Sequence, residues 1–143
     1  MINLNDLKTY WEGMKTKQPG LKSVHFVTEE GDVKDFIKDI GPDEQPFAII
    51  LVPSGKSNGS TQDNFKDDSY HLFYVLKKED SFSKTSFEIQ VELQPLTEDI
   101  KEQILMDKSS ESLLRYVDEG SFQTDPERKK FTSCTGWSVS FNS

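Results

Sequence analysis

The residues of this chain that could do chemistry are its two histidines, His25 and His71, and its single cysteine, Cys134. A structural zinc site needs four such ligands with paired spacing, and three scattered residues do not supply them. A Cys–His nucleophile pair remains open, because its members meet in space and not in sequence. We predict no metal ligand and no catalytic residue, and we keep an enzyme that uses Cys134 or His71 as an alternative.

Two further motifs resemble ligand-binding loops. Residues 55–57 (GKS) follow an apolar run, as the end of a phosphate loop would, but Ile50 stands where that loop needs its first glycine. No helix pattern follows to place a helix N-terminus at the phosphate. Three acidic residues, Asp63, Asp67 and Asp68, could bind calcium. The alternating ligands and the central glycine of a calcium-binding loop are missing, however. We interpret the segment as a solvated loop and predict no cofactor.

Length and charge limit the class of protein. A chain of 143 residues is expected to form a single domain, 1–143. Its formal net charge of −8 repels phosphate, which argues against specific nucleic-acid binding. The opening residues lack the pattern of a signal peptide, and no apolar run is long enough to cross a bilayer as a helix. We therefore expect a cytoplasmic protein without a membrane segment.

The two most apolar segments predict the centre of the fold. Residues 47–52 (FAIILV) and 69–76 (SYHLFYVL) are rich in the β-branched and aromatic side chains that strands prefer. Both are too apolar to keep one face in water, so each side of their sheet needs a cover. We predict that the two strands are neighbours in one sheet.

Two helices and a strand are predicted before this centre. Residues 4–17 carry Leu4, Leu7, Trp11 and Met14 on one stripe, with Tyr10 beside it, and Pro19-Gly20 ends the pattern. Residues 24–27 predict a short strand. Apolar residues spaced i, i+3, i+4, i+7 predict a second, short helix over 33–40, which ends before Gly41-Pro42.

The segment between the central strands predicts a long polar loop, 54–68. Loops of this length are usually functional or disordered, and the sequence leaves both outcomes open. Phe65 is its only large apolar residue, so it is either a partner contact or a side chain that packs back onto its own sheet.

Residues 86–94 fit two structures. Strict alternation of apolar and polar residues favours a half-buried strand, whereas Ile89, Leu93, Leu96, Ile100 and Ile104 form a helical stripe. Pro95 would cost about 3 kcal/mol inside a helix but little in its first turn. We predict a helix over 95–107 and leave 86–94 open.

The last part of the chain predicts further strands. Residues 113–117 fit either a helix or a strand, but residues 120–122 and a turn at Asp125-Pro126 favour extended structure. Residues 136–141 alternate, with Trp137, Val139 and Phe141 on one side. The serines between them predict a strand with one face in water. The fold class is therefore α+β: a small antiparallel or mixed sheet with a long hairpin arm, packed by an N-terminal helix and a helix near 86–108.

This order of elements in a small acidic chain resembles that of tail-terminator and tail-completion (neck) proteins. These belong to tailed phages, prophages and related contractile particles, and the small prophage-type proteins of Bacteroidetes-like genomes are the most similar. Three segments carry the resemblance: 4–11 (LNDLKTYW), 46–52 (PFAIILV) leading into the polar arm, and 134–141 (CTGWSVSF). In that family the segment after the second central strand is a long helix, which would make residues 86–94 helical.

The resemblance implies a structural role without catalysis. Such proteins form rings, often hexameric, that cap the tail tube and join it to the head, so we expect a homo-oligomeric ring that binds a tube or neck protein. The protein would be cytoplasmic during assembly and part of the particle afterwards. Ring contacts are heterologous, and the candidate contact residues lie in the arm: Lys56, Asn64, Phe65, Lys66 and Asp67. The alternative function is a cytoplasmic adaptor domain that binds another protein.

Overall fold

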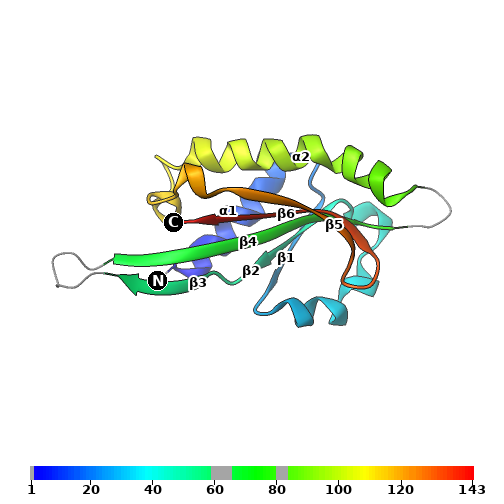
Figure 1. The fold of residues 1–143 in the computed structure, drawn as a ribbon, viewed down its shortest axis with the longest axis horizontal. Coiled ribbons are helices and arrows are strands. Elements are labelled where there is room, and N and C mark those ends of the chain that lie inside the picture. The colour runs from blue at the N-terminus through cyan, green and yellow to red at the C-terminus, as the bar shows by residue number, and fades with distance from the viewer. Residues whose placement is uncertain (1, 59–65, 80–83) are drawn as a thin grey trace.

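The structure, a computed structural model, describes residues 2–58, 66–79 and 84–143. These residues form an α+β fold in which helices and a mixed sheet are layered (Figure 1). The helices are α1 (Leu4–Lys17) and α2 (Ser86–Asp107), and the strands are β1 (Ser23–Val27), β2 (Phe47–Leu51), β3 (Ser54–Asn58), β4 (Lys66–Lys78), β5 (Gln123–Lys130) and β6 (Cys134–Asn142). The predicted fold class is confirmed.

The central strands are neighbours, as the sequence predicts. The strand order is β1-β2-β4-β6-β5, with β3 also paired to β4. β1 runs parallel to β2, and the other pairs are antiparallel. In the β2–β4 ladder Phe47 is opposite Leu76 and Ile50 is opposite Phe73. The long strand β4 therefore forms the centre of the sheet.

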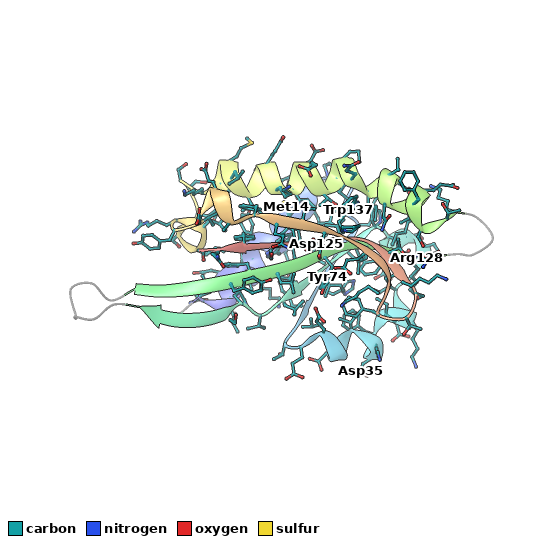
Figure 2. All side chains as sticks on the ribbon, in the orientation of Figure 1. Met14, Asp35, Tyr74, Asp125, Arg128 and Trp137 are labelled. Atoms are coloured by element: carbon teal, nitrogen blue, oxygen red, sulfur yellow. The ribbon has the colours of Figure 1, made fainter. Side chains whose placement is uncertain are left out.

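Both helices cover the same side of the sheet. The α1 helix begins at a cap, where the Asn3 side chain accepts bonds from the backbone N–H groups of Asn5 and Asp6. Its buried stripe packs on the sheet, although Leu4, predicted to belong to that stripe, is 52% exposed. Met14 and Trp137 lie between helices and sheet, whereas Tyr74 and Asp35 lie on the opposite side (Figure 2). The larger apolar core is thus formed by α1, α2 and one face of the sheet.

A half-buried carboxylate, that of Asp107, joins the two helices. Asp107 Oδ2 accepts hydrogen bonds from the Tyr10 hydroxyl at 2.9 Å and from Lys17 Nζ at 2.8 Å, and Oδ1 accepts one from Gln103 Nε2 at 3.0 Å. Burial alone raises the pKa of Asp107, but the hydrogen bonds from Lys17, Tyr10 and Gln103 outweigh it and hold the pKa below its ordinary value. The group is therefore a charged, fully partnered link between the ends of α1 and α2.

The open question at residues 86–94 is resolved as helix. Thr85 caps α2 by accepting the Glu88 backbone N–H at 3.2 Å. Of the alternating apolar residues, Ile89 and Leu93 are buried, while Phe87 and Val91 are exposed. Pro95 lies inside the helix on its exposed side. Because Pro95 has no backbone N–H, the Val91 carbonyl, four residues earlier, lacks its helical hydrogen-bond donor. Val91 is exposed, so this carbonyl can bond to water instead.

The short helix predicted over 33–40 is a set of 3-10 turns instead. They span Glu30–Asp35, Ile37–Asp39 and Pro42–Glu44, and we call residues 29–44 the turn layer. Short segments commonly adopt 3-10 geometry because isolated α-helical turns are costly to nucleate. The predicted burial is nevertheless present: Val33, Ile37 and Ile40 pack with strand residues in a second core on the face opposite the helices.

Two expectations for the C-terminal part are wrong. Residues 113–117 fitted either type of structure, and the extended alternative that the following residues favoured is wrong. Two 3-10 turns span Ser112–Leu114 and Glu119–Ser121, and Leu114 and Val117 are both buried at a spacing of three. The predicted turn at Asp125-Pro126 lies within β5, an edge strand, where proline removes no ladder bond on the outer side.

The predicted water-facing side of 136–141 is only partly exposed. Ser138 is buried and donates its hydroxyl to Glu127 Oε1 at 2.9 Å, while Ser140 is half-buried and Asn142 is exposed. The second core covers this face only near the start of β6, where Cys134 lies. The face opposite the helices is therefore covered at one end of the sheet and open at the other.

Candidate interaction surface

The structure places the two histidines and the cysteine in three separate environments. In the β4–β6 ladder His71 is opposite Phe141, whereas Cys134 is opposite Lys78, seven residues further along β4. Seven strand residues span about 23 Å, so His71 and Cys134 do not meet. His25 lies in β1, separated from β6 by β2 and β4. The Cys–His pair is thus not formed, and no group of potential ligands able to hold a metal occurs among the described residues.

Each of these groups has a structural environment. The His71 ring stacks on Phe141 with centroids 4.5 Å apart, and its Nε2 bonds to the Ser143 hydroxyl at 2.8 Å. Burial lowers the pKa of His71 to about 4. The Cys134 thiol is fully buried, and that burial raises its pKa to about 11. A neutral thiol without solvent access is a poor nucleophile.

The burial of His71 predicts a pH-dependent stability. Its pKa is about 4 in the folded chain and about 6.5 when unfolded. Between these values only the unfolded chain binds the proton, so stability is complete above about pH 6.5 and falls by about 3 kcal/mol toward about pH 4. His71→Phe keeps the stacked ring and removes this titration. Urea unfolding at about pH 7 and about pH 5 should show a smaller loss for the variant than for the natural chain.

A matched change at the other histidine provides the control for that prediction. His25 is half-buried and stacks on Phe36 with centroids 5.2 Å apart. Its pKa is lowered by burial, against an opposing effect of Glu44. His25→Phe should therefore remove less of the pH dependence than His71→Phe. If the free energy of unfolding of His71→Phe falls between about pH 7 and about pH 5 as much as that of the natural chain, the pH dependence does not come from His71.

The loop-like motifs lie in strands. The Gly55–Ser57 segment belongs to β3, and Asp67 and Asp68 belong to β4. The predicted loop is therefore strand at both of its ends; Asp63, Asn64 and Phe65 lie outside the described residues. A shallow hollow of about 470 Å³ lies at the end of α2 and is lined in part by Leu105, Lys108 and Arg115. Neither histidine nor the cysteine lines it.

β3 and the first part of β4 form a two-stranded arm that extends beyond the body (Figure 1). Its ladder pairs residues 54–58 with residues 66–70, and it places Lys56 opposite Asp68 and Asn58 opposite Lys66. Three of the five candidate contact residues, Lys56, Lys66 and Asp67, are thus in the arm's backbone ladder; the other two are outside the described residues. We define the arm as residues 54–58 and 66–69.

The arm begins at an irregularity in the ladder. Ile50 pairs with Phe73 and Ser54 pairs with Tyr70, so three residues on one side face two on the other. One extra residue in one strand is a β-bulge, which bends the strand and increases its twist. Residues 51–53 thus set the direction in which the arm leaves the sheet.

The strand edges of the body and of the arm differ. On the body, β5 is protected because it contains Pro126 and a register shift between Glu127 and Lys130, and because the Glu127 carbonyl accepts a bond from Gln90 at 3.1 Å. The arm extends past Ser69, where the Ser143 backbone makes the last bonds on the β6 side. Among the described residues, the arm's two strands pair only with each other beyond that point. Unpaired edges of this kind can accept another strand.

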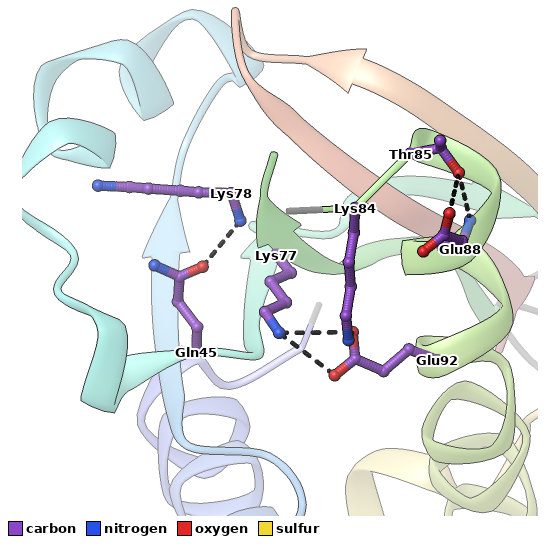
Figure 3. A network of polar contacts seen from close by, with 7 residues as sticks. All are labelled: Gln45, Lys77, Lys78, Lys84, Thr85, Glu88 and Glu92. Carbon is purple, nitrogen blue, oxygen red and sulfur yellow. Dashed lines mark hydrogen bonds and ion pairs between the residues drawn. The ribbon is translucent and has the colours of Figure 1, made fainter. Parts of the chain in front are cut away.

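At the other end of β4 the charged side chains pair with one another. Lys77 and Lys84 both contact Glu92, at 3.2 and 3.1 Å, and the Gln45 side chain accepts the Lys78 backbone N–H at 2.8 Å (Figure 3). Partial burial raises the pKa of Glu92, but hydrogen bonds from the two lysines outweigh it and lower the pKa overall. These contacts tie the start of α2 to β4.

The sequence pattern missed several exposed apolar residues. Phe87 is 72% exposed and Val91 is 53% exposed on the outer side of α2, and Tyr70 is 47% exposed on the sheet beside the arm. The alternation of residues 86–94 favoured a strand with Phe87 and Val91 on its buried face, so their exposure on a helix was not predicted. The signal for Tyr70 was its position next to the polar segment 54–68, where the central strand leaves the body.

Comparison of the chain with protein-family models, with curated proteins and with solved structures gave no match. No helix in the described part of the chain is long and apolar enough to cross a membrane.

Proposed function

We propose that this chain is a non-enzymatic assembly protein that forms an oligomeric ring at the tail end of a phage-like particle. The arm carries the proposal. An isolated two-stranded ribbon is at best marginally stable in water, so a ribbon that leaves the body with both edges unpaired is well suited to become ordered against a neighbour. Its five-residue ladder is about 16 Å long, enough to reach past the body to another subunit.

A second observation supports the same class of protein. The resemblance implies a long helix after the second central strand, and the sequence pattern of residues 86–94 departed from that expectation. The structure has α2 over Ser86–Asp107, in agreement with what the resemblance implies for this segment. The separated positions of His25, His71 and Cys134 also favour a protein whose surface is its function.

The test combines the chain with a phage-type tail-tube protein, the partner that the proposal names. We expect ring-shaped particles in electron micrographs of the chain at high concentration, and rings at the ends of tubes after mixing. The control is an arm-trimmed variant, in which Asn-Gly replaces residues 56–68 so that Gly55 and Ser69, which are ladder partners, close a two-residue hairpin turn. This variant should fold but form no rings.

The result also separates the ring protein from the adaptor alternative. A chain that stays monomeric at every concentration and does not associate with tube protein would contradict the proposal. Binding of a single tube subunit without any ring would instead favour an adaptor that holds one protein partner.

A further inference from the structure

A charged residue borders the face of the sheet at the base of the arm, because Asp125 of β5 shares this face and accepts a hydrogen bond from Gln123 Nε2 at 3.0 Å. Inside that border lie six uncharged residues of β3, β4, β5 and β6: Ser54, Tyr70, Leu72, Gln123, Ser140 and Asn142. We call them the uncharged face. Residues directly opposite in an antiparallel ladder point to the same side, and Tyr70 is opposite both Ser54 and Asn142. Depletion of charge with an exposed tyrosine is typical of the centre of a protein interface.

We infer that the uncharged face receives the arm of a second copy of this chain. This inference rests on the proposed self-assembly and names the two surfaces that meet. The second core, which covers the same side of the sheet, lies toward the other end near Phe47 and Cys134. Leu72 packs against the edge of that core, whereas Tyr70 remains 47% exposed.

Charge selects a second copy as the occupant. Two copies of a chain with net charge −8 repel each other. The turn layer is strongly acidic, with seven carboxylates and two lysines in residues 29–44. The arm contains two lysines and two aspartates and so has no net charge, and the uncharged face has none. Contact between the arm and the uncharged face therefore avoids the repulsion between copies, whereas a basic partner would bind the turn layer.

Geometry excludes the arm of the same copy. The arm continues the line of β4 away from the body (Figure 1), and Ser54 and Gly55 are held to Tyr70 and Ser69 in the ladder. Folding back over the uncharged face would break these pairs. A ribbon of two strands is about 10 Å wide, and the uncharged face extends over four strands, or about 14 Å between the outer ones. An arm from another copy fits, and this head-to-tail contact is the kind that closes rings.

The experiment places a photo-crosslinking benzoylphenylalanine at position 70 of the full chain. An equal mixture of isotopically light and heavy chains is irradiated, and crosslinked peptides are identified by mass. We expect crosslinks between light and heavy chains that join position 70 to arm peptides. The matched control has the same group at Phe87, an exposed aromatic residue on the outer side of α2, and should give none to the arm.

A pair of substitutions tests the energetics. Tyr70→Glu buries an unpaired charge in the proposed contact and should weaken self-association about tenfold or more. Phe87→Glu, on the outer side of α2, should leave self-association unchanged, and both variants should keep the natural circular dichroism spectrum. Self-association that is equally tight in Tyr70→Glu, or crosslinks from position 70 only within one copy, would overturn this inference while leaving the proposed ring intact. A natural chain that never self-associates would overturn the ring itself.

Discussion

Gly136→Ala should abolish the folded state. A methyl group at this position would lie 2.1 Å from the Val75 backbone oxygen and 3.0 Å from the Leu93 side chain, and the φ angle of +157° is one that side chains rarely adopt. A clash with backbone in the central strand β4 cannot be relieved by rotating a side chain. We expect a loss above about 4 kcal/mol, which is close to the total stability of many domains. Circular dichroism and urea unfolding would show a largely unfolded chain.

The matched control for Gly136 is another glycine. Gly13 lies in the interior of α1, where an added methyl group would meet no atom within 4 Å. Gly13→Ala should therefore raise the free energy of unfolding by about 1 kcal/mol through helix propensity. A Gly136→Ala chain as stable as the natural one would show that the backbone of β4 does not approach Gly136 of β6 as closely as the structure has it.

Trp11→Ala should cause the second largest loss, about 3–5 kcal/mol. The Trp11 side chain is 4% exposed, and its ring lies 4.7 Å from the Phe73 ring between centroids, so it joins α1 to the central strand. Truncation removes a large buried aromatic side chain and leaves a cavity under the helix. The change in unfolding free energy from urea titration measures the loss.

Two comparisons sharpen the prediction for Trp11. Trp137→Ala should cost less, because Trp137 is only half-buried, although it also loses the hydrogen bond from its Nε1 to the Gln90 carbonyl at 2.9 Å. Tyr116→Ala, at an exposed aromatic residue, should change stability by no more than about 0.5 kcal/mol. A loss in Trp11→Ala as small as that of Tyr116→Ala would contradict the packing of α1 on the sheet.

Segments with a strong local pattern were predictable. The buried stripe and Asn3 cap of α1 and the apolar runs of β2 and β4 determine their own structure, and the pairing of β2 with β4 follows from their shared need for burial. The sequence also pointed to the 54–68 segment as the candidate site, although it predicted a loop where β3 and β4 form a ladder. The polar residues of β3 do not show the alternation of apolar and polar residues that predicts a strand.

Other features depend on contacts that no local pattern contains. Residues 86–94 alternate like a strand, yet Leu93 packs where Gly136 leaves room for a helix, a contact between segments more than 40 residues apart. The turn layer keeps the predicted burial of Val33 and Ile37 but not the predicted helix. The uncharged face draws on four strands, so its composition is visible only once the sheet order is known.

Sedimentation velocity of the natural chain and the arm-trimmed variant, over a wide range of concentrations, tests the central claim most directly. The claim is that this protein acts by joining copies of itself through the arm. We predict that the natural chain forms a defined oligomer as concentration rises. The arm-trimmed variant should stay monomeric, with an unfolding free energy within about 1 kcal/mol of the natural value. Equal association by both chains, or by neither, would contradict the claim.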